Sequence, residues 1–92
     1  MKIETGDIVM TIGIATKAWE SAKFEQEVKD AVERFKNGDW GNSSPDDVEA
    51  NKQALETKDK GFFAVYHTCE EDIFIVTDDG RKNTTVLLAE EY

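Results

Sequence analysis

Residues 62–89 read FFAVYHTCEEDIFIVTDDGRKNTTVLLA and contain three short apolar runs rich in β-branched and aromatic side chains. The runs extend from Phe62 to Thr68, from Ile73 to Thr77 and from Thr84 to Ala89. Runs of this length and composition predict β-strands. Because the connections between them are short, neighbouring strands are expected to pair as antiparallel hairpins.

The N-terminal segment shows a two-residue repeat. Apolar side chains occupy every second position from Ile8 to Ile14. This alternation predicts a half-buried strand over residues 7–14. No hairpin turn joins this strand to another, so its pairing partner cannot be deduced from the sequence.

The clearest helix signal follows residue 21. Apolar residues recur there at the three- and four-residue spacing of a helix, and charged residues occupy the opposite side. The apolar positions are Phe24, Val28, Ala31, Val32 and Phe35. Ser21 is the expected N-cap and Gly38 the expected residue after the C-cap, while Trp19 is expected in a separate preceding turn.

A second helix is predicted from Ser44-Pro45-Asp46-Asp47 to about Glu56. A hydroxyl cap, a proline at the first helical position and two carboxylates beside the positive end of the dipole are typical of a helix start. The apolar content of the segment is thin, so the helix is expected to lie on the surface and to bury a narrow stripe. Such a half-apolar helix also leaves a homodimer open.

These elements together predict one α+β domain spanning residues 1–92. The expected order is β-α-α-β-β-β, and the simplest arrangement is a four-stranded, mainly antiparallel sheet with both helices packed on one face. A chain of 92 residues has enough sequence for one hydrophobic core and too little for two.

The charge balance restricts the kinds of partner. Twenty acidic residues against eleven basic ones give a net charge of −9. Such a field repels nucleic acid and anionic membranes and favours a basic partner, although it also serves solubility. The single cysteine excludes an internal disulfide, and no apolar export signal or membrane-length stretch is visible. A cytoplasmic location is expected.

No motif points to catalysis, a metal or a cofactor. His67 and Cys69 stand two positions apart, with Glu71 next in line on the same face of an extended strand. A zinc site needs about four ligands, or three and a water, and no second cluster of histidines or cysteines exists. Same-face neighbours in a strand lie roughly 6 to 7 Å apart, which is too far for a Cys–His nucleophile pair. Glycine motifs for nucleotide binding are absent, so we expect a non-enzymatic role.

Acidic residues cluster in two stretches that contain no basic side chain. The first stretch contains Asp39, Asp46, Asp47 and Glu49, and the second contains Glu70, Glu71, Asp72, Asp78 and Asp79. If the stretches meet on the surface, they form a patch that resembles a phosphate array to a basic groove. Hairpin tips and helix N-termini also attract acidic residues, which keeps a structural role open.

Trp40 completes the set of candidate partner-binding residues. It lies in the loop Gly38-Asp39-Trp40-Gly41 between the two predicted helices. A tryptophan in such a loop either folds back over the core or anchors a partner. The sequence leaves both interpretations open.

Several short segments, in order along the chain, resemble one family of small proteins. They are Gly38-Asp39-Trp40-Gly41, Ser44-Pro45-Asp46-Asp47, Phe63-Ala64-Val65-Tyr66, Ile73-Phe74-Ile75-Val76-Thr77 and Thr84-Thr85-Val86-Leu87. The family comprises short "plasmid-related" proteins of bacterial plasmids, conjugative transposons and prophages. The resemblance implies a place on a mobile genetic element. Small acidic proteins in that setting include anti-CRISPR and anti-restriction factors, some of which imitate DNA.

Charge and resemblance together favour an inhibitor of host defence. Its expected partner is a protein with a basic, nucleic-acid-binding surface, such as a CRISPR effector, and no direct binding to nucleic acid is expected. The alternative is an accessory or regulatory module of a plasmid or prophage that binds a partner protein through apolar groups.

Overall fold

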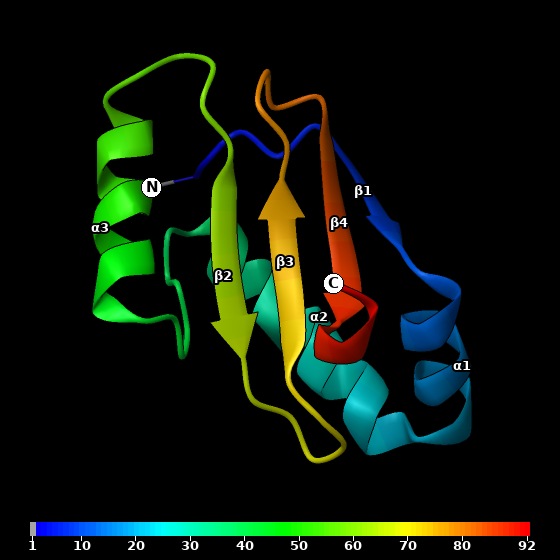
Figure 1. The fold of residues 1–92 in the computed structure, drawn as a ribbon. Helices are drawn as coiled ribbons and strands as arrows, with labels where there is room; N and C mark the ends of the chain where they lie inside the picture. Colours follow the sequence, from blue (N-terminus) through cyan, green and yellow to red (C-terminus); the bar gives the residue numbers. More distant parts are fainter. Residues whose placement is uncertain (1) are drawn as a thin grey trace.

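Four strands form one mixed sheet in the computed structural model, which describes residues 2–92 (Figure 1). The strands are β1 (Asp7–Met10), β2 (Phe62–Tyr66), β3 (Ile73–Thr77) and β4 (Asn83–Leu88). Their order in the sheet is β1-β4-β3-β2, and β2, β3 and β4 pair antiparallel as predicted. β1 pairs parallel with β4, with Ile8 opposite Thr84. The α+β class is confirmed, and the sheet is mixed because of this one parallel pair.

The N-terminal segment departs from the prediction after Met10. β1 ends there, and helix α1 (Ile12–Glu20) begins where the strand was expected to continue. The hydroxyl of Thr11 caps the helix by accepting a hydrogen bond from the N–H of Ile14 at 3.3 Å. Ile14 is buried, and Ala18 packs against the core one turn later. The apolar alternation therefore spans a strand and the first turn of a third helix.

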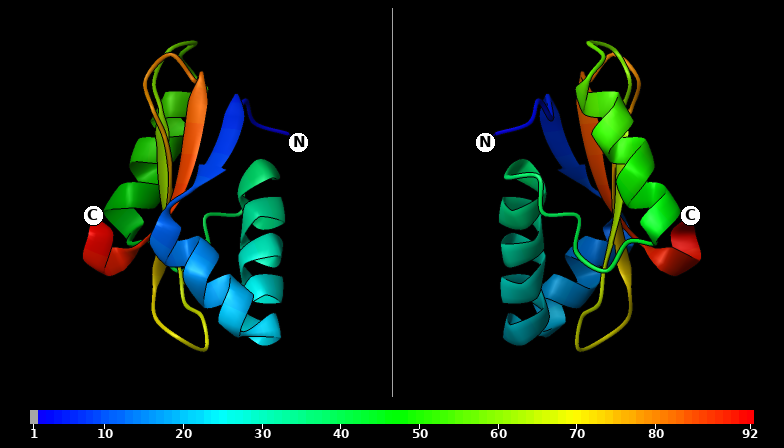
Figure 2. Two further views of the ribbon diagram at one scale, coloured as in Figure 1. Left: turned by 90° about the vertical axis from the view of Figure 1, so that its right-hand side faces the viewer. Right: turned by 90° about the vertical axis from the view of Figure 1, so that its left-hand side faces the viewer.

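Helix α2 (Ala22–Lys36) covers one face of the sheet, as the helical periodicity predicts (Figure 2). The hydroxyl of Ser21 accepts a hydrogen bond from the N–H of Phe24 at 3.1 Å, which confirms the predicted N-cap. Gly38 follows the C-cap residue Asn37 with φ of +78°, a conformation that glycine adopts without a steric penalty. The buried face contains Phe24, Val28, Ala31 and Phe35.

Helix α3 (Pro45–Leu55) begins as predicted, with the hydroxyl of Ser44 accepting a hydrogen bond from the N–H of Asp47 at 3.2 Å. Its position differs from the prediction that both helices pack on one face. α3 lies along the outer edge of β2, on the opposite side of the sheet from α2 (Figures 1 and 2). The side chain of Asn51 fixes this position through hydrogen bonds to the backbone of Phe63.

The core fills the space between α2 and the sheet. Alternate residues of β2, β3 and β4 are buried on that face, and Trp40 from the α2–α3 loop joins them. The opposite face is half-buried, and there Phe63 and Phe74 pack against Tyr92, with ring centroids 5.6 and 5.1 Å from it. A final 3₁₀ turn, η1 (Ala89–Glu91), precedes Tyr92.

Candidate functional site

The second predicted acidic stretch does not form one surface. Glu70, Glu71 and Asp72 lie in the β2–β3 turn, whereas Asp78 and Asp79 lie in the β3–β4 turn. The five residues of β3 stand between them, which is about 17 Å at the usual strand rise of 3.4 Å per residue. The two turns project from opposite ends of the sheet (Figure 1). The two acidic stretches therefore do not meet as a whole in one patch.

Two of these carboxylates organise the β3–β4 turn. The Oδ1 atom of Asp78 accepts hydrogen bonds from the N–H groups of Lys82 and Asn83, at 3.2 and 3.3 Å. The Oδ1 atom of Asp79 accepts one from the N–H of Gly61 at 2.9 Å. Aspartates commonly close turns in this way, so these two have a structural role.

Two further carboxylates lie beside basic groups. The Oδ1 atom of Asp72 lies 2.7 Å from Nδ1 of His67, and a carboxylate oxygen of Glu71 lies 3.8 Å from Nζ of Lys17. A partner that recruited either acid would first have to displace its neighbour. The turn contact of Asp72 with His67 also ties the start of β3 to the end of β2.

Asp39 is paired within the loop that leaves α2. Its two carboxylate oxygens receive hydrogen bonds from Nε and Nη2 of Arg34, at 2.9 and 3.2 Å. The Arg34 hydrogen bond, with that of the Gly41 N–H, holds the pKa of Asp39 below its usual range. The carbonyl oxygen of Asp39 also accepts a hydrogen bond from the hydroxyl of Tyr66. Asp39 therefore secures the loop.

Six of the nine predicted acids have no ion pair among residues 2–92. Asp78 and Asp79 accept hydrogen bonds from backbone N–H groups, whereas the side chains of the other four form no hydrogen bond within the described part of the chain: Asp46, Asp47, Glu49 and Glu70. Three belong to the first half of α3 and the fourth to the β2–β3 turn. The side chain of Asn42 accepts a hydrogen bond from the N–H of His67 at 3.0 Å, which holds the approach to α3 beside the end of β2. We call these four residues the acidic end. The start of α3 and the β2–β3 turn, which carry them, lie toward the lower end of the sheet in Figure 1.

Trp40 belongs to the core. Only 8% of its surface is exposed, its ring stacks on Phe62 at 5.5 Å, and Phe35 contacts it edge-on at 5.6 Å. A buried indole is not accessible to a partner, so the interpretation of Trp40 as an interface anchor is corrected. The fold-back interpretation is confirmed.

The cysteine environment disfavours a thiol nucleophile. β2 ends at Tyr66, so His67 and Cys69 lie in the turn and do not share a strand face. The backbone N–H of Cys69 donates to the carboxylate of Glu27 at 2.9 Å, and this carboxylate beside the exposed thiol raises the pKa of the thiol. The thiolate is the reactive form of cysteine, and this neighbour disfavours it. Within residues 2–92, no group of three His, Cys, Asp or Glu side chains is arranged to hold a metal ion.

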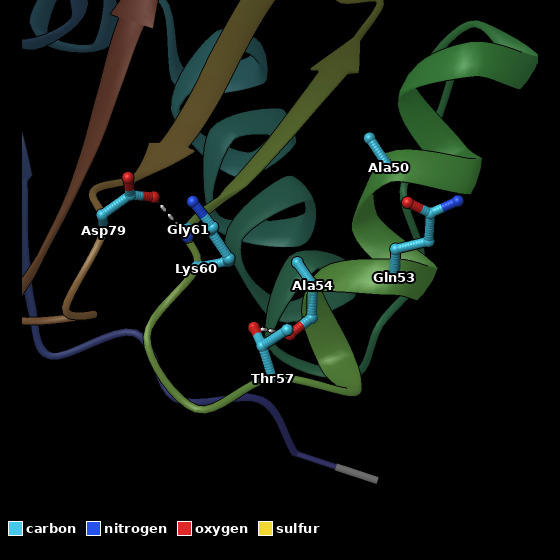
Figure 3. Close-up of a pocket in the computed structure, with 7 residues that line it drawn as sticks. All are labelled: Ala50, Gln53, Ala54, Thr57, Lys60, Gly61 and Asp79. Atoms are coloured by element: carbon cyan, nitrogen blue, oxygen red, sulfur yellow. Dashed lines mark hydrogen bonds between the residues drawn. The ribbon is translucent and has the colours of Figure 1, made fainter.

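A pocket of about 370 Å³ lies between the end of α3 and the turns above β2 and β3 (Figure 3). It is lined by Ala50, Gln53, Ala54, Thr57, Lys60, Gly61 and Asp79. Two of its polar side chains already have partners, because Asp79 binds Gly61 and the hydroxyl of Thr57 binds the carbonyl oxygen of Ala54. A smaller pocket of about 180 Å³ lies beside Tyr66 and His67. Its lining also contains Glu27, Asp30, Ala31 and Arg34, and the hydroxyl of Tyr66 donates to the carbonyl oxygen of Asp39.

The exposed apolar face of α1 was not predicted from the sequence. Ile12 and Trp19 are 84% and 91% exposed. Ile12 was expected inside a strand and Trp19 in an isolated turn. The one sequence feature that could have revealed this face is the seven-residue interval between Ile12 and Trp19, because residues seven apart in a helix lie on the same side.

Among residues 2–92, no helix combines the length and the apolar character needed to cross a membrane. No protein-family model, curated protein or solved structure matches the chain.

Proposed function

We propose that this chain is a non-enzymatic inhibitor from a mobile genetic element that binds a host defence nuclease complex. Its acidic end docks on the basic surface with which that complex holds nucleic acid, and so competes with DNA. The observation that supports this proposal is that Asp46, Asp47, Glu49 and Glu70 are not ion-paired among residues 2–92. The elements that carry them, the start of α3 and the β2–β3 turn, both lie toward the lower end of the sheet in Figure 1.

The unpaired state of these carboxylates favours binding. An arginine or lysine of a partner can donate to them without breaking a contact within the protein, whereas recruitment of Asp39 would break its two hydrogen bonds to Arg34. The net charge of −9 adds a long-range attraction toward a basic surface. Both effects weaken as salt screens them, so binding is expected to fall with ionic strength.

The elements that carry the acids also favour a preorganised contact. Asp46 and Asp47 occupy the first turn of α3, which the Ser44 cap and Pro45 fix in place. α3 is in turn fastened to β2 through Asn51. Carboxylates held on a rigid element lose little conformational freedom on binding, which supports affinity.

Capture from a bacterial lysate that contains DNA-targeting defence complexes tests the proposal. The tagged protein is used as bait with and without competing duplex DNA, in a series of NaCl concentrations, and captured proteins are identified by mass spectrometry. The proposal expects a nucleic-acid-binding defence complex that duplex DNA displaces and that salt releases. Capture of a partner indifferent to DNA and to salt would refute it.

The aromatic cluster on the outer face of the sheet favours a second candidate function, an accessory or regulatory module of a mobile element. Tyr92 is 74% exposed and lies against Phe63 and Phe74. Apolar contacts with a partner protein at this cluster would persist in high salt, unlike contacts of the acidic end. Retained capture in high salt that is lost in Tyr92→Ala would favour this candidate.

A further inference from the structure

The exposed apolar side chains concentrate in one part of the fold. Among residues 2–92, five large hydrophobic side chains are exposed, and four of them belong to β1 and α1. They are Val9 and Met10, each 48% exposed, Ile12 at 84% and Trp19 at 91%. Such a concentration on a chain with so many charged residues marks an interaction surface.

Helix geometry places Ile12 and Trp19 on one ridge of α1. Seven residues correspond to nearly two full turns, so the two side chains point in almost the same direction, about 10 Å apart along the axis. The exposed residues Ala15 and Thr16 lie between them on that side. Ile14, on the other side of the helix, is fully buried. The ridge is therefore uncharged, with large side chains at its ends and small ones in the middle.

We propose that the α1 ridge, formed by Ile12, Ala15, Thr16 and Trp19, is the interface through which two copies of this chain form a homodimer. The ridge complements itself when two α1 helices cross antiparallel about a twofold axis between Ala15 and Thr16. Ile12 of one copy then faces Trp19 of the other, and Ala15 faces Thr16. This reciprocal pairing is what an interface between identical subunits requires.

The size of the side chains fits close packing at that crossing. Small residues at the centre allow two helix axes to approach to about 8 Å. Trp19, which is nearly fully exposed in the single chain, would then cover Ile12 of the second copy. Tryptophan is among the residues most enriched at the energetic centres of interfaces.

The available area indicates a reversible dimer. The α1 ridge, together with the exposed Val9 and Met10 of β1, offers at most on the order of 600 Å² of accessible surface per copy. A standard complex buries about 800 Å² per partner. α3 is the weaker candidate interface, because its buried residues Asn51 and Ala54 already pack on β2. The homodimer through that helix, which the sequence left open, is thereby disfavoured.

Charge gives the dimer a distinctive salt dependence. Each copy carries a net charge of −9, so two copies repel one another at long range while the ridge itself bears no charge. Screening by salt removes this repulsion and leaves the apolar contact. Self-association is expected to strengthen as NaCl rises, whereas docking of the acidic end weakens. The two proposals can therefore fail separately.

Sedimentation velocity of the full chain tests this proposal, from about 5 µM to about 1 mM protein, a range that covers weak and transient interfaces. The measurement is made in low and in high NaCl. Ala15→Glu places a charge in the centre of the ridge, and Ala50→Glu is the matched control, because Ala50 is also an exposed helical alanine. Circular dichroism establishes that both variants are folded.

The proposal expects a monomer–dimer equilibrium that strengthens with salt, that weakens by about tenfold or more in Ala15→Glu and that is unchanged in Ala50→Glu. Tryptophan emission is also expected to shift to shorter wavelength as protein concentration rises, because Trp19 becomes covered in the dimer. In Trp19→Phe, this shift is expected to be absent at concentrations where the variant is monomeric. A single monomeric species throughout would overturn the proposal, as would a dimer that Ala15→Glu leaves intact.

Discussion

The side-chain amide of Asn51 forms two hydrogen bonds with the backbone of Phe63. These take the place of the two backbone hydrogen bonds that a neighbouring strand would form with Phe63. The N–H of Phe63 donates to Oδ1 of Asn51 at 3.1 Å, and Nδ2 of Asn51 donates to the carbonyl oxygen of Phe63 at 2.8 Å. Further along β2, the N–H of Val65 donates to the hydroxyl of Ser43 at 3.0 Å. An open strand edge is a template for aggregation, and here a helix and a loop cover it.

Asn51→Ala is expected to destabilise the protein by about 2 kcal/mol, because it leaves the N–H and carbonyl groups of Phe63 without partners. For a domain of this size that corresponds to a fall in Tm of roughly 10 °C. Thermal unfolding followed by circular dichroism measures the change. Gln53→Ala, an exposed position on the same helix, is the control and is expected to change stability by less than about 0.5 kcal/mol. Equal losses in the two variants would contradict the role of Asn51.

Arg81→Lys is expected to lower stability by about 1 to 3 kcal/mol, because lysine lacks the planar fork of donors. Arg81 donates to the carbonyl oxygens of Ala54, Thr57 and Lys60, at 2.6, 3.2 and 2.8 Å, and so caps the C-terminal end of α3. Its guanidinium also lies 4.6 Å from the centroid of the Phe62 ring. Chemical denaturation measures the loss, and exposed Lys82→Arg is the control. A fully stable Arg81→Lys protein would show that charge alone suffices.

Glu91→Gln is expected to weaken the protein at neutral pH and not in strong acid. The carboxylate of Glu91 accepts hydrogen bonds from the hydroxyl of Thr11 at 2.7 Å and from the N–H of Leu88 at 2.8 Å. These bonds, the one from Thr11 first, lower the pKa of Glu91. A lowered pKa contributes stability that is complete above the ordinary value and is lost as pH falls through the folded-state value.

The urea midpoints of wild type and Glu91→Gln should therefore differ at pH 7 and converge as pH falls below the ordinary glutamate range. Glu90→Gln, at the exposed neighbouring position, is the control at each pH. A difference that persists unchanged in acid would mean that the Glu91 contact does not depend on its charge.

Glu27→Gln is expected to increase the reactivity of Cys69. The neighbouring carboxylate of Glu27 raises the pKa of the thiol, so removing the carboxylate charge increases the thiolate fraction at mildly alkaline pH. The rate of reaction with a disulfide reagent at about pH 8, near the ordinary thiol pKa, measures this effect. Glu25→Gln on the same helix is the control. An unchanged rate in Glu27→Gln would contradict the assignment of Glu27 as the neighbour that restrains the thiol.

The sequence predicted the parts of the fold that local patterns determine. The caps at Ser21 and Ser44 and the three C-terminal strands follow from hydroxyl positions and apolar runs, and the structure confirms them. The side of the sheet on which α3 lies depends on the hydrogen bonds of Asn51, which pair residues twelve positions apart. Such long-range contacts leave no periodic signal.

The error at α1 has a different physical cause. Met10 and Ile14 are four residues apart, so an alternating run over residues 8–14 also contains helical spacing. The Thr11 cap and its contact with Glu91 decide between the two, and Glu91 lies 80 residues away. The missed helix is the one that carries the exposed ridge.

The sequence was enough to name the acidic residues of the candidate site, but it did not show where they lie or which of them already have partners. Five of the nine predicted acids lie beside basic groups or accept hydrogen bonds from turn backbone. To separate these five from the other four, one must know where partners such as Arg34 and Gly61 lie in the fold. The placement of Glu70 at the same end as the start of α3 follows from the fold of the 41–44 loop along β2. Charge counting alone treats all nine acids alike.

The most direct test of the proposed function compares two variants that each lose three negative charges. Asp46→Asn, Glu49→Gln and Glu70→Gln together neutralise the acidic end, and Asp7→Asn, Glu56→Gln and Asp59→Asn together form the control at exposed sites elsewhere. Each set changes the net charge from −9 to −6, since −9 + 3 = −6. Affinity for the defence complex captured from the lysate is measured at about 0.15 M NaCl by biolayer interferometry.

We predict that the acidic-end variant binds this complex at least about tenfold more weakly than the wild type, while the control variant stays within about threefold. Equal weakening in the two variants, or full binding by the acidic-end variant, would contradict the claim that Asp46, Glu49 and Glu70 form the docking surface.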